Sequence, residues 1–264
     1  MPTLSPFQRL PPEIRYQIYE DLFPPCRVQI IRRKDVGPAR KSHYRLYHRP
    51  CRIRDTQTQR VTGTSRTARR TASTLLALTM TCRVVYCETI FLLYSSMQFI
   101  FTSTKAVSRF LKTTRPDAQA AIQHIELSHI MYNEPKLTVN RIYKERSDRA
   151  WYDVCKLMAK ATKSLRVLHF RLRIRDWPIR LQVGERWSLP LAEFGDREER
   201  LHYVDIQLKT PMFDRAEVQA VARELEATLM DPAEFQMRED ERLARKLSPA
   251  KKARNVLRLV FDMS

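Results

Sequence analysis

Arginine, lysine and tyrosine side chains are interleaved in the N-terminal half of the chain in a pattern that suits contact with phosphate groups. Cations neutralise phosphates and aromatic rings stack on bases, which is the chemistry of nucleic-acid binding. A second basic cluster follows, whose alternate arginines would share one face of a strand. A solvated basic loop without a ligand is the alternative interpretation. The candidate residues for binding nucleic acid or another acidic partner are Arg32, Arg33, Lys34, Arg45, Tyr47, Arg49, Arg52, Arg171, Arg173 and Arg175.

Other side chains that could do chemistry do not form recognisable groups. No two cysteines are two to four residues apart and no His-Glu-x-x-His occurs, so we predict no metal site. His124 and His129 leave opposite faces of a predicted strand because their spacing is odd. The four glycines are isolated, which argues against a nucleotide-binding loop. We expect no catalytic residue, no cofactor and no enzyme activity; a deep apolar pocket with convergent titratable groups would favour a hydrolase or transferase instead.

The overall charge favours acidic partners. The 264 residues carry a formal net charge of +19, and they suffice for a sizeable core. No run of about 20 apolar residues occurs, so we expect no membrane association. The N-terminus lacks a basic region followed by an apolar one, and the five cysteines are an odd number. These features predict an intracellular protein with reduced thiols, either cytoplasmic or nuclear.

The most apolar part of the chain is Leu75–Phe101, and a segment of this character must be buried. Only Arg83 and Glu88 carry charge in it. We expect two helices, a turn at the two serines and a buried strand at Met97–Phe101. An amphipathic helix over Leu10–Phe23, opened by prolines, is expected to fold back onto this block.

Between these two apolar segments lies a basic insertion, residues 24–72. It holds fourteen Lys and Arg against two Asp and contributes +12 of the net charge. Val28–Arg32 and Tyr44–Ile53 contain enough β-branched and aromatic residues to pair as a basic hairpin. Gln57–Thr74 is polar and is expected to be disordered.

The rest of the chain alternates between helical and strand patterns. Asp148 and Asp214 are expected to cap helices, whereas residues 134–146 and 175–195 are expected to be mostly loops. Such alternation predicts an α/β (or α+β) fold with a small, mainly parallel sheet and crossover helices. Either a plain α/β layer or an irregular leucine-rich-repeat-like arc fits, and these differ in whether helices cover two sheet faces or one. Expected helices are Lys105–Leu111, Pro116–Ile122, Asp148–Lys163, Asp214–Met230 and Arg238–Arg254, and expected strands are Met97–Phe101, Gln123–Ser128, Leu165–Ile174, Leu201–Leu208 and Val256–Phe261.

Two segments together resemble a known pattern. The first, Leu10-Pro11-Pro12-Glu13-Ile14-Arg15 with Ile18-Tyr19, resembles the opening helix of F-box and F-box-like domains. The second resembles a block that recurs in a large fungal group of F-box-like proteins of unknown function. That block is Leu76–Tyr94 with Thr81-Cys82-Arg83, Tyr86, Glu88 and Leu92-Leu93-Tyr94-Ser95, followed by Phe99 and Phe101.

The resemblance implies a helical module, residues 1–101, that docks on a Skp-family adaptor of a cullin ubiquitin ligase. The α/β region, residues 102–264, would then select a protein substrate whose identity the sequence does not give. The alternative is that the helices serve only as core. A basic nucleic-acid-binding protein is the second function hypothesis. The adaptor-facing candidates carried over from the resemblance are Leu10, Pro11, Ile14, Ile18, Leu22, Leu75, Leu78, Cys82 and Arg83.

Overall fold

A computed structural model describes residues 6–22, 26–36, 42–51, 79, 81–132, 139–175 and 181–245. The helices are η1 (Phe7–Arg9), α1 (Pro12–Leu22), α3 (Arg83–Ser96), α4 (Thr104–Thr113), α5 (Pro116–Ala120), α6 (Arg141–Ala161), α7 (Leu189–Ala192) and α8 (Arg215–Leu229), with residues 232–245 also helical. The strands are β1 (Cys26–Val36), β2 (Ser42–Cys51), β3 (Met97–Phe101), β4 (His124–Met131), β5 (Val167–Ile174) and β6 (Tyr203–Lys209).

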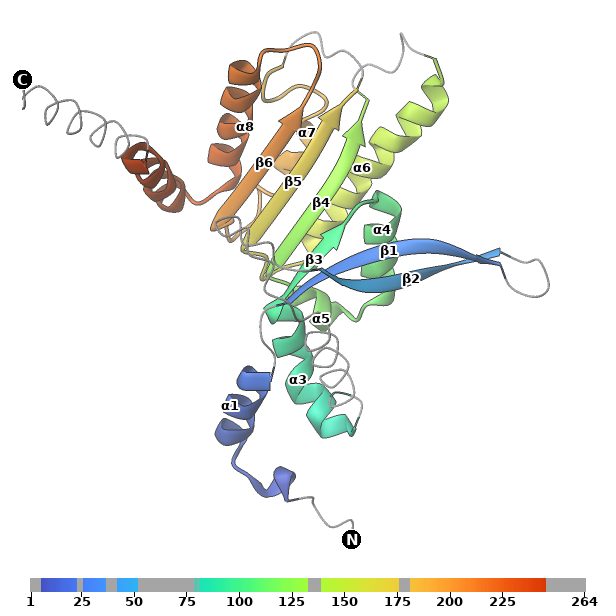
Figure 1. The fold of residues 1–264 in the computed structure, drawn as a ribbon, viewed down its shortest axis with the longest axis vertical. Coiled ribbons are helices and arrows are strands. Elements are labelled where there is room, and N and C mark those ends of the chain that lie inside the picture. Colours follow the sequence, from blue (N-terminus) through green and yellow to red (C-terminus); the bar gives the residue numbers. More distant parts are fainter. Residues whose placement is uncertain are drawn as a thin grey trace, which may run out of the picture.

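The described strands form a six-stranded sheet in the order β2-β1-β3-β4-β5-β6. β1 and β2 are antiparallel, and every other neighbouring pair is parallel. Helices connect consecutive parallel strands from β3 to β6 (Figure 1). The predicted α/β fold with a mainly parallel sheet and crossover helices is therefore confirmed. The predicted regions 1–101 and 102–264 share this one sheet, and the boundary between them remains a prediction.

The main helices pack against one face of the sheet (Figure 1). Alternate strand residues such as Phe99, Leu127 and Phe170 enter the main core together with buried side chains of α4, α6 and α8. Strand residues of the opposite parity, such as Arg171, point to the other face, which we call the open face. Of the two arrangements that the sequence allowed, the described helices fit the one in which a single face is covered.

The basic hairpin forms, but it belongs to the main sheet. β1 pairs with β2 from Arg27↔Cys51 to Val36↔Ser42, and its first half also pairs in parallel with β3. Val28, Ile30 and Leu46 lie on the core side of the hairpin. These apolar residues anchor a segment that the sequence presented as an insertion. The strands are also longer than predicted at the turn end of the hairpin.

Helix α6 starts earlier than the sequence indicates. It begins at Arg141, after Asn140 in the left-handed conformation with φ of 62°. Asp148 lies inside the helix, and its Oδ1 accepts a hydrogen bond from the Tyr132 backbone N–H at 3.1 Å. The predicted cap at Asp148 is therefore wrong, because its carboxylate has a tertiary partner. The predicted inward-facing stripe, which includes Trp151, is buried.

Other boundaries differ by a few residues. The predicted turn at Ser95 and Ser96 is the last turn of α3, where the two hydroxyls donate to the Leu92 and Leu93 carbonyls. The predicted loop 175–195 contains the short helix α7. The predictions for Gln57–Thr74 and Val256–Phe261, and the first helix expected in the apolar block, fall outside the described residues, apart from Thr79 in that block.

Candidate interaction surfaces

The N-terminal lobe, formed by η1, α1 and α3, is held together by one half-buried carboxylate. Glu88 of α3 forms an ion pair with Arg15 at 2.6 Å and accepts a hydrogen bond from the Tyr19 hydroxyl at 2.9 Å. The Arg15 guanidinium lowers the pKa of Glu88, whereas burial and the Glu88 contact raise the pKa of Tyr19 to about 12. The expected folding of α1 onto the apolar block is confirmed for α3.

A small core lies around this carboxylate. Tyr19, Val85 and Leu93 are buried together, and Tyr94 and Met97 pack against both this cluster and the main core. The Cys82 Sγ accepts a hydrogen bond from the Val85 backbone N–H at 3.5 Å and so caps α3. The lobe thus fixes the position of α1 through side chains that the apolar periodicity of α1 did not identify.

The apolar row on α1 is therefore not the face on which the helix packs. Ile14 and Leu22 are 42% and 41% exposed, and Ile18 between them is half-buried. Tyr19, on a neighbouring face of the helix, is fully buried. We call Ile14, Ile18 and Leu22 the α1 row. A partner can reach it in the described part of the chain.

The remaining adaptor candidates have different surroundings. Pro11 and Arg83 are exposed. Leu10 is half-buried, and its carbonyl accepts a hydrogen bond from Arg15 at 2.6 Å. Cys82 is also half-buried and is engaged inside the lobe, whereas Leu75 and Leu78 fall outside the described residues. The α1 row is the part of the candidate set that combines apolar character with exposure.

Helix α3 exposes apolar side chains that the sequence analysis did not single out. Val84 and Phe91 are 48% and 49% exposed. They are seven residues apart, which places them on one side of the helix two turns apart. The helical spacing was readable in the sequence, but the choice of buried face depended on Glu88 and its partners in α1.

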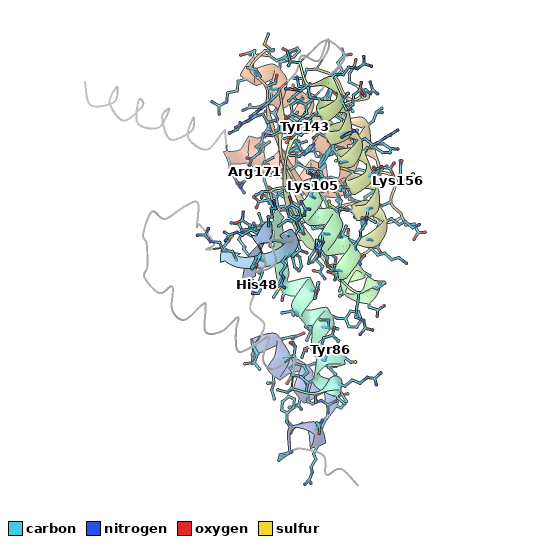
Figure 2. All side chains as sticks on the ribbon, turned by 90° about the vertical axis from the view of Figure 1, so that its right-hand side faces the viewer. His48, Tyr86, Lys105, Tyr143, Lys156 and Arg171 are labelled. Carbon is cyan, nitrogen blue, oxygen red and sulfur yellow. The ribbon has the colours of Figure 1, made fainter. Side chains whose placement is uncertain are left out.

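The basic candidates gather on the open face of the sheet. The register pairs Arg33 with Arg45 and places Arg49 on the same side of the hairpin. Arg171 and Arg173 share that side on β5. Figure 2 shows Arg171 on the opposite side of the sheet from Lys156 of α6. Two clusters that lie far apart in the sequence are thus combined on one face.

Not every basic candidate belongs to that face. Arg32 has the core-side parity, and its guanidinium lies 3.6 Å from the centroid of the Tyr44 ring. Lys34 has the same parity as Arg32. Tyr47 shares the open-face parity, Arg175 follows the end of β5, and Arg52 falls outside the described residues. The continuous basic run Arg32-Arg33-Lys34 is therefore divided between two faces.

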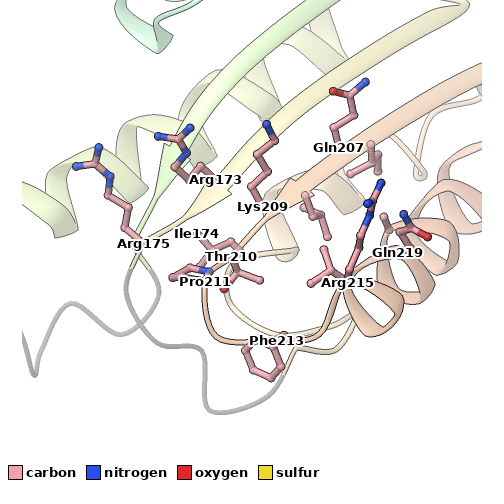
Figure 3. A pocket seen from close by; sticks show the side chains of 14 residues that line it. Arg173, Ile174, Arg175, Gln207, Lys209, Thr210, Pro211, Phe213, Arg215 and Gln219 are labelled. Atoms are coloured by element: carbon pink, nitrogen blue, oxygen red, sulfur yellow. The ribbon is translucent and has the colours of Figure 1, made fainter.

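A cleft opens beside the carboxyl ends of β5 and β6 (Figure 3). It has a volume of about 840 Å³ and lies between the second half of β6 and the first turns of α8. Arg173, Arg175, Lys209 and Arg215 contribute cations to its lining, whereas Ile206 and other apolar side chains line the rest. The sequence analysis identified two of these four cations but gave no indication of the cleft.

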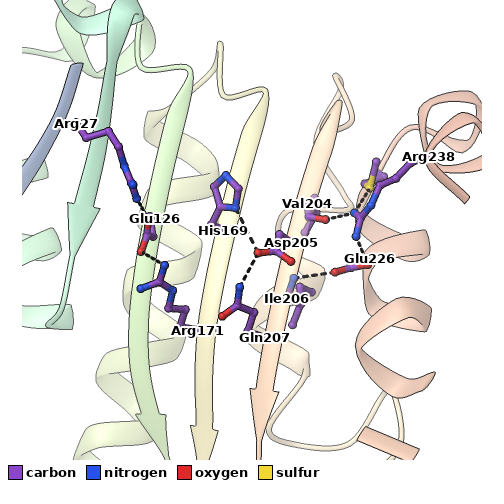
Figure 4. A network of polar contacts seen from close by, with 11 residues as sticks. Arg27, Glu126, His169, Arg171, Val204, Asp205, Ile206, Gln207, Glu226 and Arg238 are labelled. Atoms are coloured by element: carbon purple, nitrogen blue, oxygen red, sulfur yellow. Dashed lines mark hydrogen bonds and ion pairs between the residues drawn. The ribbon is translucent and has the colours of Figure 1, made fainter. Parts of the chain in front are cut away.

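Further along the open face, two carboxylates are engaged by neighbours (Figure 4). Glu126 is 4% exposed and forms ion pairs with Arg27 at 2.7 Å and Arg171 at 3.0 Å. Asp205 lies 3.5 Å from His169, and this contact lowers the pKa of the carboxyl. Glu126 thus links the hairpin to β5, because Arg27, which was not among the predicted candidates, lies on β1 and Arg171 lies on β5.

A third carboxylate, Glu226 of α8, fastens the helix to the edge strand β6 (Figure 4). It accepts hydrogen bonds from the Ile206 backbone N–H and from Arg238, both at 2.8 Å. Arg238 also donates to the Val204 carbonyl. Burial raises the pKa of Glu226. This arrangement satisfies backbone groups on the outer edge of the sheet, which would otherwise lack a strand partner.

The described residues contain no group of three or more His, Cys, Asp or Glu side chains placed to hold a metal ion. None of the described helices combines the length and apolar character needed to cross a membrane.

Comparisons with known proteins place the chain in a family. A search of curated proteins finds no match, and a search of solved structures finds none either. The family described as "Domain of unknown function (DUF7730)" matches residues 3–188, which cover α1, the hairpin, the apolar block and the sheet as far as β5. The chain belongs to this family of unknown function.

Proposed function

We propose that the chain is a non-enzymatic interaction protein that docks through α1 on a Skp-family adaptor of a cullin ubiquitin ligase. The exposure of the α1 row carries the proposal. The α/β region would then present a protein substrate of unknown identity. The choice of adaptor rests on the resemblance of Leu10–Arg15, Ile18 and Tyr19 to the opening helix of F-box domains.

The geometry of α1 suits docking into an apolar groove. Residues four apart form one line along a helix, which is how amphipathic helices contact such grooves. Ile14 and Leu22 retain about two fifths of their surface in contact with solvent. Covering that remaining surface would contribute about 1 kcal/mol for each side chain. The contacts of Glu88 with Arg15 and Tyr19 hold the helix in place before a partner arrives.

The test is binding of the purified chain to a purified Skp-family adaptor. Ile14→Asp combined with Leu22→Lys reverses the character of the α1 row while placing each charge at the helix end that favours it. Gln17→Asp changes an exposed residue of the same helix outside the row and serves as the control. We expect the double variant to lose binding and the control to retain it. Absence of binding by the unmodified chain would reject the adaptor proposal.

A second candidate function is nucleic-acid binding on the open face. The observation that favours it is the shared parity of Arg33, Arg45 and Arg49 with Arg171 and Arg173. Sheets that bind single-stranded RNA combine such cations with exposed rings. Tyr47 has this parity and is exposed.

Salt dependence tests this second candidate. Arg33→Ala with Arg49→Ala should lower the slope of log affinity against log salt for single-stranded RNA by about 1.4, because two phosphate contacts are lost. The control, Lys156→Ala with Lys160→Ala, removes the same charge from the helix side. An affinity that does not change with salt, or an equal loss in both variants, would reject it.

A further inference from the structure

The cleft beside β6 combines an unusual charge arrangement with an apolar wall. Arg173 of β5 is the direct ladder partner of Lys209 of β6. Like charges placed directly opposite each other on neighbouring strands are destabilising. Arg215, the first residue of α8, stands across from them (Figure 3). An anion bound between these groups would offset their mutual repulsion.

Among the described residues, the lining contains no acidic side chain that would provide this compensation. The fourteen described residues of the lining include four cations and no Asp, Glu, His or Cys. Within the described part of the chain, no ion pair joins Arg173, Lys209 or Arg215 to a carboxylate. The composition suits binding of an anion and does not provide a general base or a thiol nucleophile.

The remainder of the lining suits an organic group. Ile206, Leu208 and Val218 form an apolar wall, and Phe213 lies at one end of the cleft (Figure 3).

The volume of the cleft and its position in the fold indicate the size of the ligand. A volume of about 840 Å³ falls within the range of small-molecule sites, about 300–1,000 Å³. Ligands of open α/β sheets bind outside the carboxyl ends of the strands, and the cleft lies at that end of β5 and β6. Both features favour a small molecule over a macromolecule at this place.

We propose that the cleft binds a small organic phosphate. Its phosphate is held by Arg173, Lys209 and Arg215, and its apolar or aromatic part lies against Phe213. This site is separate from the α1 row and does not depend on adaptor docking. It shares Arg173 and Lys209 with the open face, so the test includes a matched variant of the hairpin to separate the two sites.

The probe is 1-naphthyl phosphate, titrated into the full chain by calorimetry, with inorganic phosphate and 1-naphthol as the separate halves. We expect saturable one-to-one binding, tighter than that of either half. Lys209→Ala with Arg215→Ala should weaken binding about tenfold or more, because two charge-assisted contacts are lost. Both side chains are exposed, so circular dichroism and the urea midpoint should show a folded variant.

Arg33→Ala with Arg49→Ala removes the same charge from the hairpin and is the matched control, expected to change the affinity less than twofold. Phe213→Ala should weaken binding of 1-naphthyl phosphate more than that of inorganic phosphate. Absence of saturable binding, or an equal loss in the hairpin control, would overturn the proposal. It would also be overturned if the Lys209 and Arg215 substitutions abolished only the binding of a single-stranded oligonucleotide, because the cleft would then belong to the nucleic-acid face.

Discussion

His129 should make the stability of this protein depend on pH in a defined window. It lies on β4 on the side that faces α6, where its ring stacks on Trp151 with centroids 4.5 Å apart and an interplanar angle of 14°. Its Nε2 atom is buried without a hydrogen-bond partner among the described residues. Burial lowers the pKa of His129 to about 4 from its ordinary value of 6.5.

The sign and size of the effect follow from proton linkage. Between pH 6.5 and 4 the unfolded chain binds a proton at this position and the folded chain does not. The free energy of unfolding therefore has its full value above pH 6.5 and falls as the pH is lowered toward 4. A difference of about 2.5 pKa units corresponds to about 3 kcal/mol at the low end of the window.

The measurement is urea unfolding followed by tryptophan fluorescence at several pH values from 7.5 to 4. His129→Phe keeps a ring against Trp151 but cannot take up a proton, and His129→Leu removes both the ring and the titration. The advantage of the wild type over each variant should shrink by about 3 kcal/mol as the pH falls through the window. Parallel curves for the wild type and both variants would refute the reasoning.

Three other substitutions test the contacts that hold the architecture. Glu88→Gln should speed hydrogen exchange of the α1 amides while the sheet stays protected, because the ion pair with Arg15 is lost. The folded chain lowers the pKa of the Glu88 carboxyl, so acid below about pH 4.5 should have a similar effect on the wild type. Unchanged exchange of the α1 amides would contradict this. Glu226→Ala should lower the free energy of unfolding by about 3 kcal/mol in urea, because Arg238 and the Ile206 N–H lose their acceptor. Phe170→Ala should cost about 4 kcal/mol in the same assay, since the ring is fully buried, and a loss below about 1 kcal/mol would contradict its core role.

Local patterns predicted the parts of the fold that depend on near neighbours. The alternation in Leu165–Ile174 predicted β5, and the cap at Asp214 with the apolar stripe after it predicted α8. In both segments the apolar residues that the period selects are the ones buried in the core. The apolar periodicity and the helix cap were enough to predict these two elements, because the core lies on only one side of each.

Contacts between distant residues explain what the sequence did not predict. The parallel pairing of β1 with β3 joins segments about 70 residues apart, and no local signal distinguishes it from a free hairpin. Tyr19 can be buried because Glu88, 69 residues away, accepts a hydrogen bond from its hydroxyl. Asp148 has the composition of a helix cap but binds the backbone of Tyr132. In each case a partner far along the chain outweighs the local preference.

The charge of the open face follows from the same one-sided architecture. A strand packed by helices on a single face needs apolar residues at every second position only, so the intervening positions tolerate arginines without loss of core. Within the sheet, Glu126 forms an ion pair with Arg171, and Asp205 contacts His169. Arg173 and Lys209 lie closer to the carboxyl ends of the strands, past these carboxylates, and face each other across the ladder. Binding of an anion at that end of the sheet would therefore raise the free energy of unfolding of the chain, because only the folded state brings these two cations together.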